Sequence, residues 1–157
     1  MNKLLITATL LLWLSGCQIP VPAPEPGPTL FTDAEIDLVT DRGIAYINEG
    51  PDVLSAEEID SDYASVERCL GMTADPYDLT VVHSDRAANY TDTNGGLLVT
   101  PYQSFLLLTP YTFDEYWSKH YTRILMRHEM VHYILLKATG DGDVEHDSGL
   151  FAGCMYI

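Results

Sequence analysis

Two histidines and a glutamate inside an otherwise apolar stretch constrain this chain more than any other feature. His128 and His132 lie one helical turn apart, with Glu129 between them, in the segment RHEMVHYILL at 127–136. Side chains at positions i and i+4 project from one face of a helix, with β-carbons about 5–6 Å apart. Burying both imidazoles without a shared partner would be costly. The spacing therefore predicts a helix whose two histidines hold one metal ion.

Zinc suits this pair, because it binds imidazole nitrogens at about 2.0–2.1 Å. Glu129 is rotated by about 100° from His128 around the helix, so it flanks the ion without being a ligand. The pattern resembles the HExxH signature of zinc metallopeptidases. That resemblance implies His128 and His132 as zinc ligands and Glu129 as the general base that takes a proton from water. The alternative is a pair of hydrogen-bonded core histidines without an ion.

A catalytic zinc needs a third protein ligand, and the chain after the helix offers three neighbouring candidates. His146 follows Gly140 by six residues, which span up to about 20 Å and allow the chain to fold back. Glu145 and Asp147 beside it also have metal-binding chemistry. The segment 127–151 resembles SprT-like minimal zincins, in which HExxH is followed by a third histidine and an aromatic residue. The resemblance implies a zincin-like site with His146 as the third ligand.

The resemblance also implies a group that stabilises the oxyanion of the reaction, commonly Tyr, His or Arg in zincins. Tyr111, His120 and Tyr156 are the candidates, and the sequence does not choose among them. His120 lies two helical turns before His128, too far to bind the same ion. His83 ends a β-rich segment and is interpreted as a surface or packing residue.

The first 16 residues form a predicted lipoprotein signal peptide. Lys3 precedes an apolar run at 4–14, which is too short to span a membrane, and the run ends in LSGC. This tetrapeptide resembles the bacterial lipobox and implies that Cys17 is lipidated. The alternative is an ordinary signal peptide with an incidental cysteine. Gln18 stands where an Asp favours the inner membrane, so the outer membrane of the cell envelope is expected.

A proline-rich tether follows the lipidated cysteine at 17–29. Five of the nine prolines occupy alternate positions there, a density that favours extended polyproline II. At about 3.1 Å per residue, the proline-rich part is a spacer of roughly 30 Å. The folded domain is therefore expected at 30–157.

The two remaining cysteines are predicted to form a disulfide. Cys69 and Cys154 are left once Cys17 carries lipid, and the export route leads to an oxidising compartment. Such a bond would tie the second predicted helix to the segment that follows His146. Two buried free thiols are the alternative.

The order of secondary structure predicts an α+β domain, zincin-like, with a small and mostly antiparallel sheet and a long active-site helix. Three segments open with a capping box and predict helices: 32–48, 55–70 and 112–139. Three β-rich segments lie between the second and third helices: 78–83, a hairpin around Asn94–Gly96, and 103–109. By analogy with zincins, a strand at 105–108 is expected above the helix, where it pairs with an extended peptide.

The net charge of the chain limits the kinds of partner that the domain can bind. The chain carries 23 Asp and Glu against 8 Lys and Arg, a net charge of −15, which excludes nucleic acid as a partner of the domain. The predicted function is a membrane-anchored zinc metallopeptidase with a peptide or protein substrate. The alternative is a lipoprotein binding module whose zinc site is structural or vestigial.

Overall fold

A computed structural model describes residues 31–51, 53–91, 94–110, 115–143 and 145–157. The predicted signal peptide, Cys17, the tether and the candidate Tyr111 lie outside the described residues. The part from Phe31 to Ile157 is one compact unit. Within the described part of the chain, no helix is both long and apolar enough to cross a membrane.

Five strands form one mixed sheet. They are β1 (Leu38–Val39), β2 (Ala45–Asn48), β3 (Leu79–His83), β4 (Gly95–Val99) and β5 (Ser104–Leu108). Their order across the sheet is β1-β2-β3-β5-β4. The central pairs β2–β3 and β3–β5 are parallel, and the outer pairs β1–β2 and β4–β5 are antiparallel. The prediction of an α+β domain is confirmed, whereas the prediction of a mostly antiparallel sheet is wrong, because a helical crossover joins β2 to β3.

The helices are α1 (Ala56–Leu70), α2 (Glu115–Thr139) and α3 (Leu150–Cys154), with single 3₁₀ turns η1 (Asp33–Glu35) and η2 (Asp85–Asn89). Helix α1 begins and ends as predicted. Its N-cap Ser55 exchanges hydrogen bonds with Glu58, and Gly71 closes it with a left-handed φ of 64°. Helix α2 also ends as predicted, while the predicted cap at Thr112 lies outside the described residues.

The helix predicted at 32–48 is wrong. Its capping box is real, since Thr32 and Glu35 bond reciprocally, but the helical turn stops after three residues. The chain then forms β1 and β2 around a tight turn in which Gly43 N donates to the Thr40 carbonyl at 3.0 Å. Gly43 has φ of 86°, a conformation that ends helices and suits turns. Pairing of β2 with β3 therefore outweighs the local helical pattern.

The hairpin predicted around Asn94–Gly96 is also displaced. The turn lies at 100–103 instead, where Thr100 N donates to the Gln103 carbonyl at 2.9 Å. Gly95 and Gly96 stand inside β4, paired with Leu108 and Leu107. The glycines therefore do not form a turn but allow the side chains of Glu129 and Thr91 to approach β4 closely.

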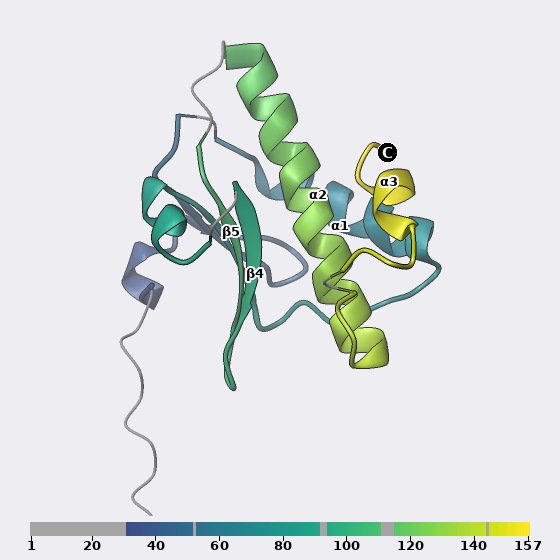
Figure 1. Cartoon of the computed structure of the whole chain (residues 1–157). Helices are drawn as coiled ribbons and strands as arrows, with labels where there is room; N and C mark the ends of the chain where they lie inside the picture. Colours follow the sequence, from purple (N-terminus) through teal and green to yellow (C-terminus); the bar gives the residue numbers. More distant parts are fainter. Residues whose placement is uncertain (1–30, 52, 92–93, 111–114, 144) are drawn as a thin grey trace, which may run out of the picture. The chain divides into compact units, whose positions relative to one another are not determined.

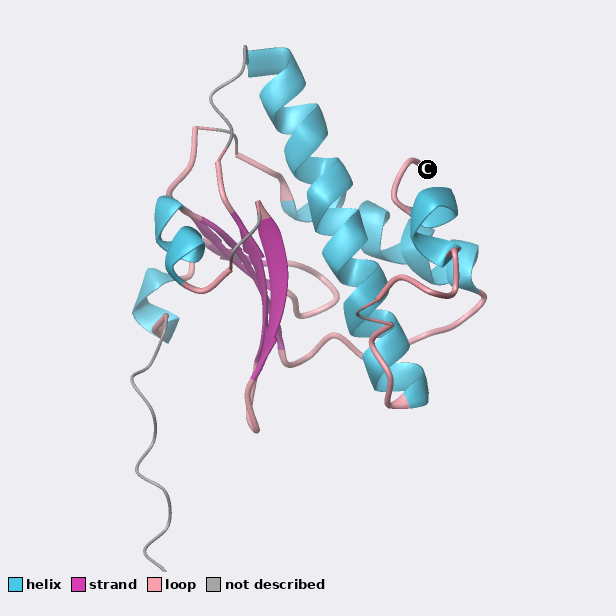
Figure 2. Ribbon diagram, viewed as in Figure 1, coloured by secondary structure: helices cyan, strands magenta, loops and turns pink. Residues whose placement is uncertain are grey.

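The main core fills the space between the sheet and the α-helices. Figures 1 and 2 show α2 with β4 and β5 on one side and α3 on the other. Fully buried residues from sheet and helices meet in this core: Tyr46, Val81, Leu106, Leu108, Tyr63, Met126, Met130 and Tyr133. Phe31 packs on Phe105 at 5.9 Å between ring centroids and covers the opposite face of the sheet. Helix α2 is thus held from two sides, which fixes the direction of its polar residues.

Candidate metal centre

Three histidine rings converge beside α2. His128 and His132 lie on α2. The chain after α2 folds back along the helix (Figure 1), and His146 in this segment meets both residues. His146 Nε2 lies 3.2 Å from His128 Nε2 and 3.2 Å from His132 Nε2. Within the described residues, these three form the only group of potential ligands whose donor atoms all lie within 4.8 Å of one another. The two residues that the sequence offered as alternatives to His146 do not join this group.

The spacing of the nitrogens fits a tetrahedral ion. Two imidazole nitrogens bound at about 2.0–2.1 Å to one tetrahedral zinc are separated by about 3.3–3.4 Å. The separations of 3.2 Å around His146 are close to that value. Three imidazoles also match the donor set that zinc uses in catalytic sites. The residues present therefore fit zinc.

The protonation of the rings favours ligation. His132 Nδ1 lies 2.7 Å from the Gly142 carbonyl, which can only accept, so Nδ1 carries the proton and Nε2 keeps its lone pair. Burial, followed by the charges of His132 and His146, lowers the pKa of His128 to about 4. Burial also lowers the pKa of His132. Both rings on α2 are therefore neutral at neutral pH, the form that binds metal.

Phe151 packs against all three histidines. Its ring centroid lies 4.8 Å from that of His128, 4.4 Å from His132 and 4.3 Å from His146. Phe151 belongs to α3, and Cys154 of the same short helix is joined to Cys69 of α1 by a disulfide. The structure thus contains the disulfide that the sequence predicted, and it fastens α3 beside the rings.

Ion pairs support α2 next to the histidines. Asp62 of α1 is buried and accepts from Arg123 at 2.7 Å and from Arg127 at 3.0 Å. Arg127 also donates to the carbonyls of Met155 and Ile157. The residue directly before His128 therefore links α1, α2 and the segment after α3.

The side chain of Glu129 lies between α2 and strand β4. Its side chain is 5% exposed, and burial raises the pKa of its carboxyl to about 7. The side chain lies against Gly95 of β4, where an added β-carbon would stand 2.9 Å from Glu129 Oε1. A carboxyl with a pKa near neutrality can both accept and release a proton.

His120 is not part of this cluster, and the candidate Tyr111 lies outside the described residues. His120 is exposed two turns before His128 on α2, and Tyr156 is exposed beyond the end of α3. His83 is fully buried at the end of β3, and its Nδ1 lies 3.0 Å from Asn48 Oδ1. His83 is therefore a packing residue, one of the two roles that the sequence allowed.

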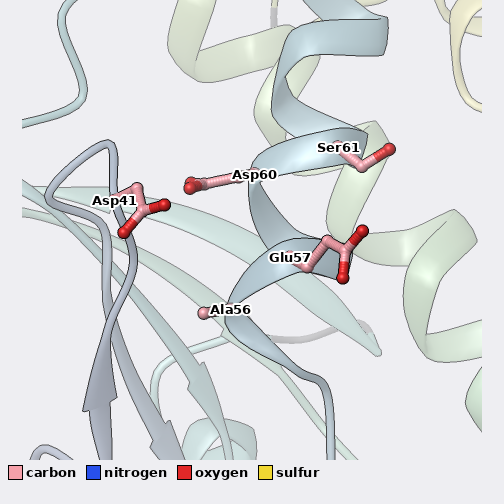
Figure 3. Close-up of a pocket in the computed structure, with 5 residues that line it drawn as sticks. All are labelled: Asp41, Ala56, Glu57, Asp60 and Ser61. Atoms are coloured by element: carbon pink, nitrogen blue, oxygen red, sulfur yellow. The ribbon is translucent and has the colours of Figure 1, made fainter.

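A separate pocket lies between the β1–β2 turn and the start of α1 (Figure 3). It is lined by three carboxylates and two small residues: Asp41, Glu57, Asp60, Ala56 and Ser61. These carboxylates do not come within ligand reach of one another as the three histidines do. The histidine cluster is the better candidate for chemistry.

The geometry combines two neutral imidazoles on a rigid helix, a third imidazole on a loop, and a buried carboxyl one residue from a ligand. Sequence reasoning placed all four of these side chains but missed Gly95, Gly142 and Asp143, whose roles depend on contacts between distant segments. The arrangement can hold a divalent cation and move a proton beside it. Comparison of the chain with protein-family models, with curated proteins and with solved structures gave no match.

Proposed function

We propose that this chain is a zinc-dependent metallopeptidase, anchored to the bacterial cell envelope through a lipid on Cys17. The convergence of His128, His132 and His146 beside the buried Glu129 is the observation that carries the proposal. When bound, zinc supplies a Lewis acid that polarises a peptide carbonyl and makes water acidic enough to lose a proton near neutral pH. All other steps belong to side chains of the protein.

Glu129 is the general base of this proposal. Its carboxylate accepts a proton from the attacking water and later delivers the proton to the leaving amine. The elevated pKa of about 7 suits both transfers, because burial makes the protonated form accessible at neutral pH. The side chain of Glu129 lies against Gly95 of β4, so β4 helps to fix the position of the proposed base.

The substrate is proposed to be an extended peptide that pairs with β4. The strand expected for this role, 105–108, lies in β5 and is paired on both sides, with β3 and with β4. Strand β4 ends the sheet order and packs against α2. Strand addition at such an edge supplies backbone hydrogen bonds beside Glu129. A sheet with its edge strand over the active-site helix supports a zincin-like fold for the proposal.

The test uses the soluble domain, metal analysis and Glu129→Gln. The parent should contain one zinc per chain and cleave members of a broad peptide library. The Glu129→Gln variant keeps the shape of the side chain and should bind zinc equally, while its cleavage rate falls by about 10²–10⁴-fold. An equally active variant would refute the role of Glu129. A zinc-loaded parent that cleaves nothing would instead favour a binding module with a structural zinc.

A further inference from the structure

The loop that carries His146 has an unusual backbone. Four of its residues adopt a left-handed conformation: Gly140, Asp143, His146 and Gly149, with φ of 82°, 51°, 59° and 69°. Glycine takes this conformation without strain, whereas only a few per cent of all other residues adopt it, with Asp and His among the more frequent of these. Two non-glycine residues in this region therefore need stabilising contacts, and one of the two is a proposed zinc ligand.

Asp143 supplies those contacts. Its carbonyl accepts the His146 N–H at 2.9 Å. Its carboxylate accepts the backbone N–H groups of Asp147 at 2.9 Å and Ser148 at 3.1 Å, and the Ser148 hydroxyl donates to it as well. Three successive amides, at 146, 147 and 148, thus point at one residue. The hydrogen bond from Ser148, the largest cause, lowers the pKa of Asp143 and keeps the carboxylate charged.

The residue before Asp143 orients a second ligand. The Gly142 carbonyl accepts the Nδ1–H of His132 at 2.7 Å. A β-carbon at Gly142 would lie 3.4 Å from the His132 carbonyl oxygen, so the loop is seated directly on α2. Gly142 therefore bonds to the ring of His132, and its neighbour Asp143 bonds to the backbone N–H of His146.

We propose that Asp143 is a positioning residue that sets His146 at the metal centre before the ion binds. The inference rests on the proposed zinc site and extends it, since Asp143 acts through the turn around His146 and is not itself a ligand. Its carboxylate oxygens are occupied by the amides of Asp147 and Ser148 and by the Ser148 hydroxyl. Partners that orient metal ligands typically contribute about 10–100-fold to metal affinity.

The experiment compares Asp143→Ala with Glu145→Gln in the otherwise intact protein. Both variants lose one negative charge within three residues of His146, but Glu145 is exposed and does not join the group of converging donor atoms. Zinc affinity is measured by competition with a chromophoric chelator. The geometry of the site is followed by the visible absorption of the cobalt(II)-loaded protein. Asp143→Ala should bind zinc about 10–100-fold more weakly and lose the intense four-coordinate cobalt bands, whereas Glu145→Gln should match the parent.

Three outcomes would decide the matter. A folded Asp143→Ala variant with the zinc affinity and cobalt spectrum of the parent overturns the inference and leaves the proposed function standing. A parent that binds no zinc overturns both. If Asp143→Ala does not fold, Ser148→Ala removes one donor to the same carboxylate without changing charge. That variant should lose a few-fold in zinc affinity, and an unchanged affinity would overturn the inference.

Discussion

Gly95→Ala isolates the contact between the edge strand and the proposed general base. The β-carbon added at Gly95 would stand 2.9 Å from Glu129 Oε1, whereas ordinary contact begins near 3.4 Å. The oxygen must therefore retreat by 3.4 − 2.9 = 0.5 Å, or the side chain must change rotamer. The next nearest atom, the Leu107 carbonyl oxygen at 3.5 Å, needs no adjustment. The strain thus falls on one carboxylate.

Gly95→Ala is expected to lower the activity while leaving the stability nearly unchanged. A misplacement of about 1 Å at a reacting group costs roughly 10²-fold in rate, so a shift of half that size should lower kcat/KM by about tenfold. Alanine restricts the unfolded chain more than glycine does, a gain of about 0.5–1 kcal/mol that offsets the crowding. The free energy of unfolding should therefore change by less than about 1 kcal/mol. Zinc binding should stay unchanged, because none of the three histidines is among the atoms nearest to the added β-carbon.

Gly96→Ala is the matched control. Consecutive residues of a strand face opposite sides of the sheet, and a β-carbon at Gly96 would meet Thr91 Oγ1 at 3.1 Å rather than Glu129. Cleavage of a peptide selected on the parent is compared for both variants, alongside zinc content and thermal unfolding. A folded, zinc-loaded Gly95→Ala variant with the rate of the parent would refute the assignment. If Gly96→Ala lost as much cleavage activity, the loss would come from a distortion of β4 and not from the contact with Glu129.

Three further predictions concern the anchor, the disulfide and pH. Cys17→Ser should move the protein from the detergent phase to the aqueous phase on fractionation, and retention in the detergent phase would contradict the lipobox interpretation. Replacing Cys69 and Cys154 together by Ser opens a loop with a sequence separation of 85, which should lower the free energy of unfolding by roughly 4 kcal/mol in denaturant titrations. The zinc-free protein should lose stability as the pH falls from about 6.5 toward 4, because unfolded His128 binds a proton that the folded ring, with its pKa of about 4, binds only at lower pH. His128→Ala should flatten the stability–pH curve between about pH 6.5 and 4. An unchanged slope would show that His128 does not cause the loss of stability.

Elements specified by local signals could be predicted. Helix α1 has its own capping box and a terminal glycine, and α2 keeps an uninterrupted helical pattern up to Thr139. The strands at β3 and β5 are short apolar runs between turn residues. The helix expected at 32–48 failed because its capping box closes a single turn. The remainder of that segment is shaped by pairing with β3, a partner that lies beyond α1 in the sequence.

The candidate site likewise has some features that follow from local sequence and others that depend on contacts between distant segments. Helical spacing alone brings His128 and His132 together, and chain length allowed His146 to return to them. The contact of Gly95 with Glu129 depends on the register of β4 against β5 and on how α2 packs on the sheet. The role of Asp143 depends on its left-handed backbone and on hydrogen bonds to residues 146–148, which the sequence alone does not specify. Such contacts between distant segments require coordinates.

The disulfide connects the proposed zinc site to the redox state of the protein. Phe151 touches every ring of the cluster, and one turn later Cys154 is bonded to α1. The proposed zinc site, whose donors are all nitrogens, is therefore held in place by a disulfide that would not touch the ion. We expect the disulfide to form before zinc is bound. Thiol reductants in a purification buffer would act twice, since they compete for zinc and also release the helix beneath the rings.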